Sequence, residues 1–333
     1  MLLKLIKKWV ILEGNNMDNF SVINNIAEDL TAKEYVTNPA IAREEEIKRL
    51  MIVLLAPDKS ALLVGKPGIG KTAIVEGLAY AIQQDLVPDA LKGYRVFKVN
   101  SSSLMNKVVI NGNEMLNINL LVNELKSMNK VILFIDEVHT LVGANSESPV
   151  DLANILKPSL DRGDIKAIGA TTTIEYETYV VRDRAFLRRF DRIDVSEPDI
   201  NTTIEILFKS LPRFEYKTGI KFKYNDYIVN MLLESIVNAT SEYKRVYGLS
   251  AMYPDVAFSV LSQAFSMALI DNRSEVNVLD VYNAIKNSKR IYPDSIVKEL
   301  ASFREKFSQL CMDEGINLPV VSVSDLDVNE QIQ

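Results

Sequence analysis

An apolar run followed by a glycine-rich turn and a helical pattern constrains the fold of this chain most. Residues Ala61–Val64 form the apolar run, and the turn after it matches the pattern GxxxxGK[ST]. From Thr72 to Gln83 apolar residues recur at helical spacing. Strand, loop and helix in this order are the setting in which the pattern acts as a phosphate-binding loop. An accidental glycine turn is the alternative, and the setting argues against it.

The turn contains the groups that a nucleotide phosphate needs. Its glycines let backbone N–H groups converge on phosphate oxygens at the start of a helix. Lys71 would bring a cation to the β- and γ-phosphates, and the hydroxyl of Thr72 would ligate Mg²⁺. The predicted nucleotide-binding residues here are Gly65, Lys66, Pro67, Gly68, Ile69, Gly70, Lys71, Thr72 and Ala73.

A second apolar run ends in two acids. Val131–Ile135 is continuously apolar, and Asp136 and Glu137 follow it. Acids at the carboxyl end of a strand face the crevice in which α/β sheets bind ligands. Asp136 is suited to holding Mg²⁺ through its water shell, and Glu137 to orienting or deprotonating an attacking water. A solvated strand end is the alternative, and the phosphate loop in the same sheet argues against it.

Apolar runs and helical patterns alternate up to Pro198, which indicates an α/β fold with a parallel sheet covered by helices on both faces. Beyond it every periodic segment is helical, which predicts a small all-helical lid domain; its clearest stripe is Ala257, Val260, Leu261 and Ala264. A last helix is expected around Phe303, Phe307 and Leu310, and Val320–Gln333 is expected to be mobile. The predicted parts are 1–30 (amphipathic segment and linker), 31–200 (nucleotide-binding domain), 201–292 (helical domain) and 293–333 (helix and acidic tail).

Composition narrows the class of protein. The 333 residues are 47% apolar and 25% charged, as in globular chains without membrane spans. A net charge of −6 is a poor electrostatic match for nucleic acid. One cysteine, Cys311, and one histidine, His139, supply no internal disulfide and no His/Cys zinc site. We therefore expect a cytoplasmic protein.

The first residues are amphipathic. Met1–Leu12 carries three interleaved lysines, so no uninterrupted apolar run is long enough to span a membrane. On a helix these lysines would lie opposite Leu5 and Trp9, as in a segment at a membrane surface. A short helix packed on protein is the alternative, and so is an extension upstream of a start at Met17.

Six segments in a fixed order resemble the first ATPase module of the Clp family of AAA+ unfoldases, the ClpA, ClpB and ClpC group. They begin at Asn38 (NPAIAREEEI), Gly65 (GKPGIGKTAIVEGLA), Val131 (VILFIDEVHTLVGA), Leu156 (LKPSLDRGDI), Ile168 (IGATTTIEY) and Phe186 (FLRRFDRI). The resemblance implies a AAA+ P-loop fold and Mg²⁺-dependent hydrolysis of ATP to ADP and phosphate. It also implies nucleotide-dependent assembly with itself, as a homohexameric ring, and a protein substrate or assembly partner.

Further residue roles follow from the resemblance. Thr172 matches the sensor 1 position, and Arg188 and Arg189 match the arginine-finger pair that reaches the neighbouring subunit's site. With Glu137 and Lys71 they make up the predicted catalytic set. The segment that lines the adenine pocket corresponds to Pro39, Ala40 and Ile41. His139 matches a position where the family also tends to have histidine, and we expect it to be structural.

The sequence also departs from the family pattern. Ile110 stands where the family has the aromatic residue that grips polypeptide in the pore, and Val256 stands where a lysine lies toward the nucleotide. Ala42 replaces a glycine, a minor change unless the position needs a positive φ. The chain has no second P-loop and no peptidase-docking tripeptide of the isoleucine-glycine-phenylalanine kind. It is therefore expected to be either a stand-alone single-ring ATPase or part of something longer.

Three functions remain open at this point. The leading hypothesis is an ATP-hydrolysing machine that remodels a protein partner. The second is an ATP-switched oligomeric scaffold with slow turnover and no threading, which the changes at Ile110 and Val256 favour. The third, a nucleic-acid loader, is disfavoured by the acidic charge balance and by the lack of a basic stripe with interleaved aromatic residues.

Overall fold

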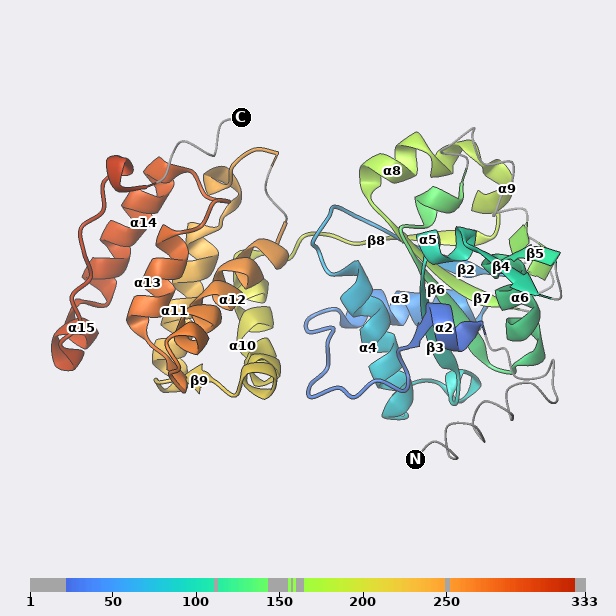
Figure 1. Cartoon of the computed structure of the whole chain (residues 1–333), viewed down its shortest axis with the longest axis horizontal. Coiled ribbons are helices and arrows are strands. Elements are labelled where there is room, and N and C mark those ends of the chain that lie inside the picture. The colour runs from blue at the N-terminus through green and yellow to red at the C-terminus, as the bar shows by residue number, and fades with distance from the viewer. Residues whose placement is uncertain are drawn as a thin grey trace, which may run out of the picture.

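The computed structural model describes residues 22–110, 113–142, 155–156, 158–159, 165–248 and 252–326. They form an α/β domain and a helical domain, joined by the chain between strand β8 and helix α10 (Figure 1). The amphipathic pattern at Met1–Leu12 lies outside the described residues. Within them, no helix is both long and apolar enough to cross a membrane.

The α/β domain is built on one mixed sheet. Among the described residues its strand order is β1-β3-β6-β7-β2-β8. The strands from β3 to β8 in this order are parallel, as predicted, whereas the edge strand β1 pairs antiparallel with β3, which the sequence did not predict. The strands span Ala27–Asp29 (β1), Ser60–Val64 (β2), Arg95–Asn100 (β3), Val131–Asp136 (β6), Lys166–Thr171 (β7) and Phe190–Asp194 (β8).

Both faces of this sheet are buried, which explains the continuous apolar runs. In β6, Leu133 and Ile135 pack into one hydrophobic cluster, while Ile132 and Phe134 pack into the cluster on the opposite face. Successive side chains of a strand point to opposite faces, so a strand between two layers must be apolar throughout.

Helices cover the sheet from both sides (Figure 1). Helices α3 (Glu44–Leu55) and α4 (Lys71–Gln83) bury apolar residues in one cluster, and α6 (Asn117–Ser127) buries its stripe in the other. Shorter helices are α2 (Ile23–Ile26), α5 (Ser101–Met105), α8 (Thr173–Thr178) and α9 (Arg184–Leu187).

A β-hairpin that the sequence did not reveal precedes α6. Strands β4 (Lys107–Ile110) and β5 (Asn113–Leu116) pair antiparallel, and Lys107 forms an ion pair with Glu114 at 2.8 Å. The predicted pore-loop residue Ile110 ends β4, and the two residues after it lie outside the described part of the chain.

The second domain is helical, with one small exception to the all-helical expectation. Strands β9 (Lys221–Phe222) and β10 (Glu275–Val276) form a short parallel pair. All four residues of the predicted stripe, from Ala257 to Ala264, are buried in its core. The helices are α10 (Ile200–Thr218), α11 (Asp226–Ala239), α12 (Asp255–Ile270), α13 (Val278–Lys286), α14 (Pro293–Lys306) and α15 (Ser308–Glu314).

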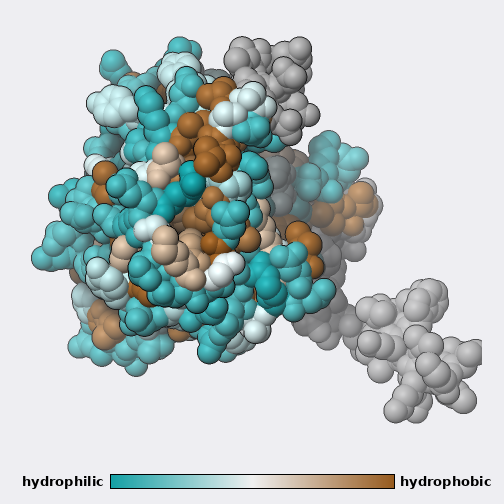
Figure 2. All heavy atoms as spheres, turned by 90° about the vertical axis from the view of Figure 1, so that its left-hand side faces the viewer, coloured by the Kyte–Doolittle hydropathy of each residue, from teal (hydrophilic) through white to brown (hydrophobic). Residues whose placement is uncertain are grey.

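The C-terminal helices belong to the same core. Phe303 of α14 and Cys311 of α15 are buried in the cluster formed by α10 to α13, and Val321 joins them. The single expected helix is therefore two helices that break at Phe307, and the expectation of a mobile chain from Val320 is wrong for its first part. The outer face of this domain is mostly hydrophilic, with small apolar patches (Figure 2).

Candidate active site

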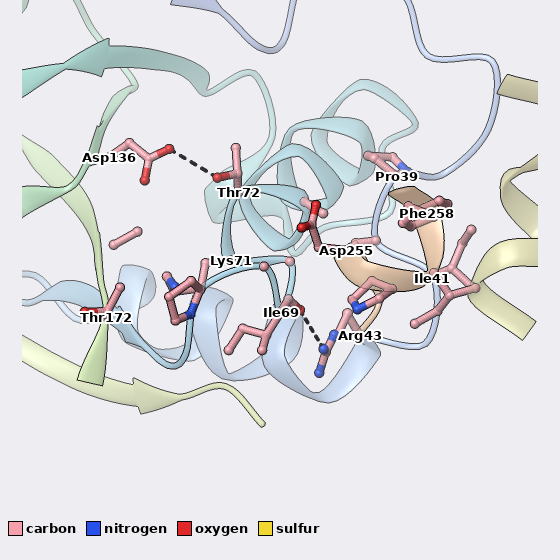
Figure 3. Close-up of a pocket in the computed structure, with 18 of the residues that line it drawn as sticks. Pro39, Ile41, Arg43, Ile69, Lys71, Thr72, Asp136, Thr172, Asp255 and Phe258 are labelled. Carbon is pink, nitrogen blue, oxygen red and sulfur yellow. Dashed lines mark hydrogen bonds between the residues drawn. The ribbon is translucent and has the colours of Figure 1, made fainter. Parts of the chain in front are cut away.

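A cleft of about 440 Å³ lies where the two domains meet. The described residues that line it include most of the predicted set: Pro39, Ala40, Ile41, Pro67, Gly68, Ile69, Gly70, Lys71, Thr72, Ala73, Asp136, Glu137 and Thr172. Gly65 and Lys66, also predicted, are not among its lining residues; their carbonyl oxygens accept hydrogen bonds from Nζ of Lys71. The cleft therefore joins segments that are far apart in the sequence (Figure 3).

The phosphate loop connects β2 to the N-terminus of α4. Gly70 is the N-cap of α4 with φ of 95°, a left-handed conformation that favours glycine. A side chain at Gly65 would overlap Ile69 and the carbonyl of Val195. The first N–H groups of a helix have no partner within it, so they are available to an anion bound at this end.

Lys71 folds back onto this loop. Its Nζ donates hydrogen bonds to the carbonyl oxygens of Gly65 at 2.8 Å and Lys66 at 3.0 Å. Burial lowers the pKa of Lys71, and the carboxylates of Asp136 and Glu175 act in the opposite direction. The ammonium group is therefore held beside the helix N-terminus, where a phosphate oxygen could replace the two carbonyl groups.

Asp136 and Thr72 meet at the carboxyl edge of the sheet (Figure 3). The hydroxyl of Thr72 donates to Oδ2 of Asp136 at 3.2 Å, and Nζ of Lys98 lies 3.6 Å from the same oxygen. A hydroxyl and a carboxylate are the oxygen donors that Mg²⁺ prefers, so the residues present fit this ion. No group of three or more His, Cys, Asp or Glu side chains suited to a metal was found in the described parts of the chain.

Glu137 follows Asp136 in a strained conformation. Its φ is 54°, in the left-handed region that a residue with a Cβ seldom adopts. Its N–H donates to Oδ1 of Asp136 at 3.2 Å. Such strain costs on the order of 1–3 kcal/mol and persists where the surrounding structure requires it. The strained turn ends β6 and leaves Glu137 lining the cleft.

Thr172 caps helix α8 beside the acids. The N–H of Glu175 donates to Oγ1 of Thr172 at 3.3 Å, and the N–H of Thr172 donates to Oε2 of Glu175 at 3.1 Å, so the two residues form a capping box. Oγ1 of Thr172 also donates to Oε2 of Glu175 at 2.7 Å. Burial alone would raise the pKa of Glu175, but the hydrogen bonds from Thr172 and Thr171 and the nearby His139 together outweigh it and lower the pKa. Glu175 also lines the cleft and was not predicted.

His139 lies next to this capping box. Its Nδ1 is 3.2 Å from Oε2 of Glu175 and 3.2 Å from Oγ1 of Thr171, and its ring stacks on Tyr179. It is not among the described lining residues of the cleft. These contacts fit the expected structural part.

The far end of the cleft is apolar and uses both domains. Ala40, Ile41 and Ile206 are buried there, and Phe258 of α12 lines the same end, close to Pro39 and Ile41 (Figure 3). Residues that line the cleft but were not predicted are Arg43, Ala170, Thr171, Glu175, Ile206, Ser210, Arg213, Pro254, Asp255 and Phe258. Helical spacing marks the apolar ones only as core residues, and nothing in the spacing of the polar ones indicates that they line a site.

Val256 does not face the cleft. It is fully buried in the core of the helical domain, whereas its neighbour Asp255 lines the cleft. The residue that replaces the family's lysine is therefore a core residue in this chain. A different cation, Arg213 of α10, lines the cleft from the helical domain.

Arg188 and Arg189 lie apart from the cleft of their own chain. They follow α9, and neither is among the described residues that line the cleft. The side chain of Arg188 is exposed. Hydrogen bonds to its carbonyl groups hold the segment in place: Nζ of Lys59 donates to the carbonyl oxygen of Arg188 at 3.2 Å, and the N–H of Ser60 donates to that of Arg189 at 2.8 Å.

Comparisons with known proteins agree with this geometry. The family model described as "ATPase family associated with various cellular activities (AAA)" matches residues 61–197. ClpC of Staphylococcus saprophyticus is 36% identical over 283 residues, which are 83% of this chain and 33% of ClpC. ClpB of Bacteroides thetaiotaomicron is 35% identical over 294 residues, 87% of this chain and 33% of ClpB.

Solved structures agree as well. A Saccharomyces cerevisiae Hsp104:casein complex in its extended conformation aligns with a TM-score of 0.65 at 32% identity, over 80% of this chain and 44% of the Hsp104 chain. The fold and the cleft thus define a AAA+ P-loop ATPase domain. More closely, the chain belongs to the Clp family of AAA+ ATPases. It spans about a third of the length of the curated relatives that it matches.

Proposed function

We propose that this chain hydrolyses ATP with Mg²⁺ as one subunit of a ring that remodels a protein partner. The observation that carries the proposal is the convergence of Lys71, Thr72 and Asp136 with Glu137 in one cleft that also has apolar lining residues from both domains. A triphosphate would place its phosphates at the N-terminus of α4 and its base between the domains.

Each residue then has a chemical role. The N–H groups of the loop and Lys71 bind the β- and γ-phosphates, and Thr72 and Asp136 hold the metal. Bound Mg²⁺ would neutralise charge on the phosphate oxygens. Glu137 accepts a proton from the attacking water, and Thr172 helps to position that water and the γ-phosphate.

The arginine pair supports a shared site. Arg188 is exposed and lies outside its own cleft, so its guanidinium is available to the cleft of a second copy. An arginine supplied in trans stabilises charge on the transferring phosphoryl group. A closed ring gives every subunit such a neighbour, and a homohexamer is the ring that the family resemblance implies. The Hsp104 relative was solved with casein, which supports a protein as the substrate class.

Turnover and particle mass test this function together. The protein should hydrolyse ATP, and Glu137→Gln should bind ATP without hydrolysing it, because the carboxylate base is lost while the phosphate loop is intact. With ATP, the mass of Glu137→Gln should rise about sixfold over that of the monomer. Absence of turnover at every protein concentration, with normal ATP binding, would refute the enzymatic part.

A nucleotide-switched scaffold is the second candidate. One observation favours it: β4 ends in Ile110, which has no aromatic ring with which to grip an extended polypeptide. A threading assay with a tagged unfolded protein, run on the natural sequence and on Ile110→Tyr, separates the two candidates. A machine should thread or gain threading with the aromatic ring, whereas a scaffold should do neither.

A further inference from the structure

Arg43 joins the phosphate loop to the segment that connects the two domains. Its Nη2 donates to the carbonyl oxygen of Ile69 at 2.8 Å, within the loop (Figure 3). Its Nη1 donates to the carbonyl oxygen of Ser196 at 3.1 Å, between β8 and α10. One guanidinium group therefore fixes the nucleotide loop and the start of the interdomain connection relative to each other.

The contacts of Arg43 are those of a buried charge with defined partners. Its side chain is 8% exposed, and Nη1 also pairs with Oε1 of Glu46 at 2.7 Å. A buried charge is tolerated when it is paired and hydrogen-bonded. The planar guanidinium directs several donors at once in fixed directions, whereas a lysine ammonium acts as a compact point charge on a flexible stem. Lysine could therefore keep the charge but not all three contacts.

The residue before Arg43 has a strained backbone conformation. Ala42 has φ of 55°, the left-handed conformation that costs a residue with a Cβ about 1–2 kcal/mol. The N-cap of α3 follows at once, and it is Arg43 itself. This sharp turn accompanies the inward position of the Arg43 side chain, and such strain persists where the structure around it demands it.

The next residue of the connection is held from the other domain. Nη1 of Arg245 donates to Oε1 of Glu197 at 2.8 Å, and the N–H of Tyr253 donates to the same oxygen at 2.8 Å. Arg245 is 5% exposed and lies over the ring of Tyr253. Two consecutive residues of the connection are thus hydrogen-bonded to buried arginines of opposite domains. Ser196 is bonded to Arg43 of the α/β domain, and Glu197 to Arg245 of the helical domain. In addition, the N–H of Met252 approaches the carbonyl of Pro67, in the phosphate loop, at 3.4 Å.

We propose that Arg43 is a positioning residue that couples the phosphate loop to the orientation of the helical domain. If the Ile69 carbonyl moves when phosphate binds, the hydrogen-bonded Arg43 side chain moves with it and displaces Ser196. The neighbouring Glu197 is bonded to Arg245, so the helical domain moves as well. This route does not need a cation at Val256, which is buried away from the cleft. The inference rests on the proposed nucleotide-dependent function.

The test measures domain orientation and ATP binding in the same molecules. Two dyes are placed on exposed residues by Gln84→Cys and Asp313→Cys, with Cys311→Ala removing the native thiol and Glu137→Gln preventing hydrolysis. Energy transfer between the dyes is compared with ADP and with ATP. The variant is Arg43→Lys, and the matched control is Arg95→Lys, an arginine paired with Asp29 at 2.6 Å at the sheet edge.

The expected result is specific to coupling. The Arg43→Lys variant should keep its fold and bind ATP no more than about tenfold more weakly. It should lose at least about half of the ADP-to-ATP difference in energy transfer, because lysine cannot replace all the charge-assisted hydrogen bonds of the arginine. The Arg95→Lys control should keep the full difference. Should Arg43→Lys fail to fold, Arg245→Lys tests the same route from the helical domain and should show the same loss.

Two results would overturn the inference. One is a full energy-transfer difference in folded Arg43→Lys or in Arg245→Lys. The other is no difference in the unsubstituted labelled protein, although it binds both nucleotides. Failure of the proposed function is measured separately: it would appear as an absence of ATP hydrolysis in the protein that retains Glu137.

Discussion

The hydroxyl of Thr72 donates to Oδ2 of Asp136 at 3.2 Å, although the two residues are 64 positions apart. Thr72 lies in the first turn of α4 after β2, and Asp136 ends β6, with β7 between these strands. In a parallel sheet the carboxyl ends of the strands meet at one edge, so both side chains reach the same point. This contact marks the position at which Mg²⁺ would bind.

Replacing Asp136 by asparagine should raise the Mg²⁺ concentration needed for ATP hydrolysis. The amide keeps the shape but loses the charge, and a residue that holds a metal through its water shell contributes about 10–100-fold in metal affinity or activity. The measurement is ATPase rate against Mg²⁺ concentration. Asp89→Asn, on an exposed residue paired with Lys92, is the control and should not move the curve. An unchanged curve for Asp136→Asn would contradict the role given to this carboxylate.

Glycine at position 42 should stabilise the protein. The φ of Ala42 is 55°, which glycine adopts without the cost of the Cβ, although glycine makes the unfolded chain more flexible. We expect a net gain of about 0.5–1 kcal/mol in the free energy of unfolding for Ala42→Gly. Ala56→Gly is the control: φ there is −67°, so it should lose stability. Denaturant unfolding measures both, and a loss at position 42 would contradict the strain argument.

Part of the loss of the protein's stability at acidic pH should come from protonation of Glu175. Hydrogen bonds from Thr172 lower the pKa of Glu175 in the folded state, so its contribution is complete above about pH 5 and is lost as the pH falls through and below its ordinary value of about 4.3. Glu175→Gln should therefore be less stable at pH 7, with a smaller further loss on acidification. Thermal unfolding between pH 7 and pH 3.5 measures this, with exposed Glu177→Gln as control. If the stability of Glu175→Gln and that of the unsubstituted protein fell in parallel with pH, this role of Glu175 would be contradicted.

The central sheet and its site were largely predictable, because both have strong local causes. The strands β2 and β6 are buried on both faces, and this burial demands the continuous apolar runs that the sequence shows. Once the strands are known to be parallel, their carboxyl ends must bring Lys71 and Asp136 to one crevice.

Other elements have no such local signal. The strands of the β4–β5 hairpin are four residues each, and β9 and β10 are two residues each, so pairing with a partner defines them more than pattern does. The break between α14 and α15 at Phe307 falls inside a continuous helical pattern. Arg43 and Glu175 come to the cleft through long-range packing and a helix cap, which spacing along the chain does not reveal.

Arg188 is exposed and lies outside its own cleft. The central claim of the proposed function is therefore that a second copy of the chain completes each ATPase site with its arginines. Two inactive variants test it when they are mixed. Glu137→Gln keeps the arginines but lacks the base. The double variant Arg188→Ala, Arg189→Ala keeps the base but lacks the guanidinium groups.

Steady-state ATP hydrolysis of the two variants, separately and mixed in equal amounts, is the decisive measurement. The arginine double variant alone should fall by about 10³-fold or more, since an arginine supplied in trans contributes on the order of 10³–10⁵ in rate. Glu137→Gln alone should fall by about 10²–10⁴-fold, the usual contribution of a general base. The account predicts that the mixture regains a substantial part of the original rate, because a Glu137→Gln subunit lends its arginines to an intact neighbouring cleft. A mixture as inactive as its components, or an arginine double variant that hydrolyses ATP at the full rate, would contradict it.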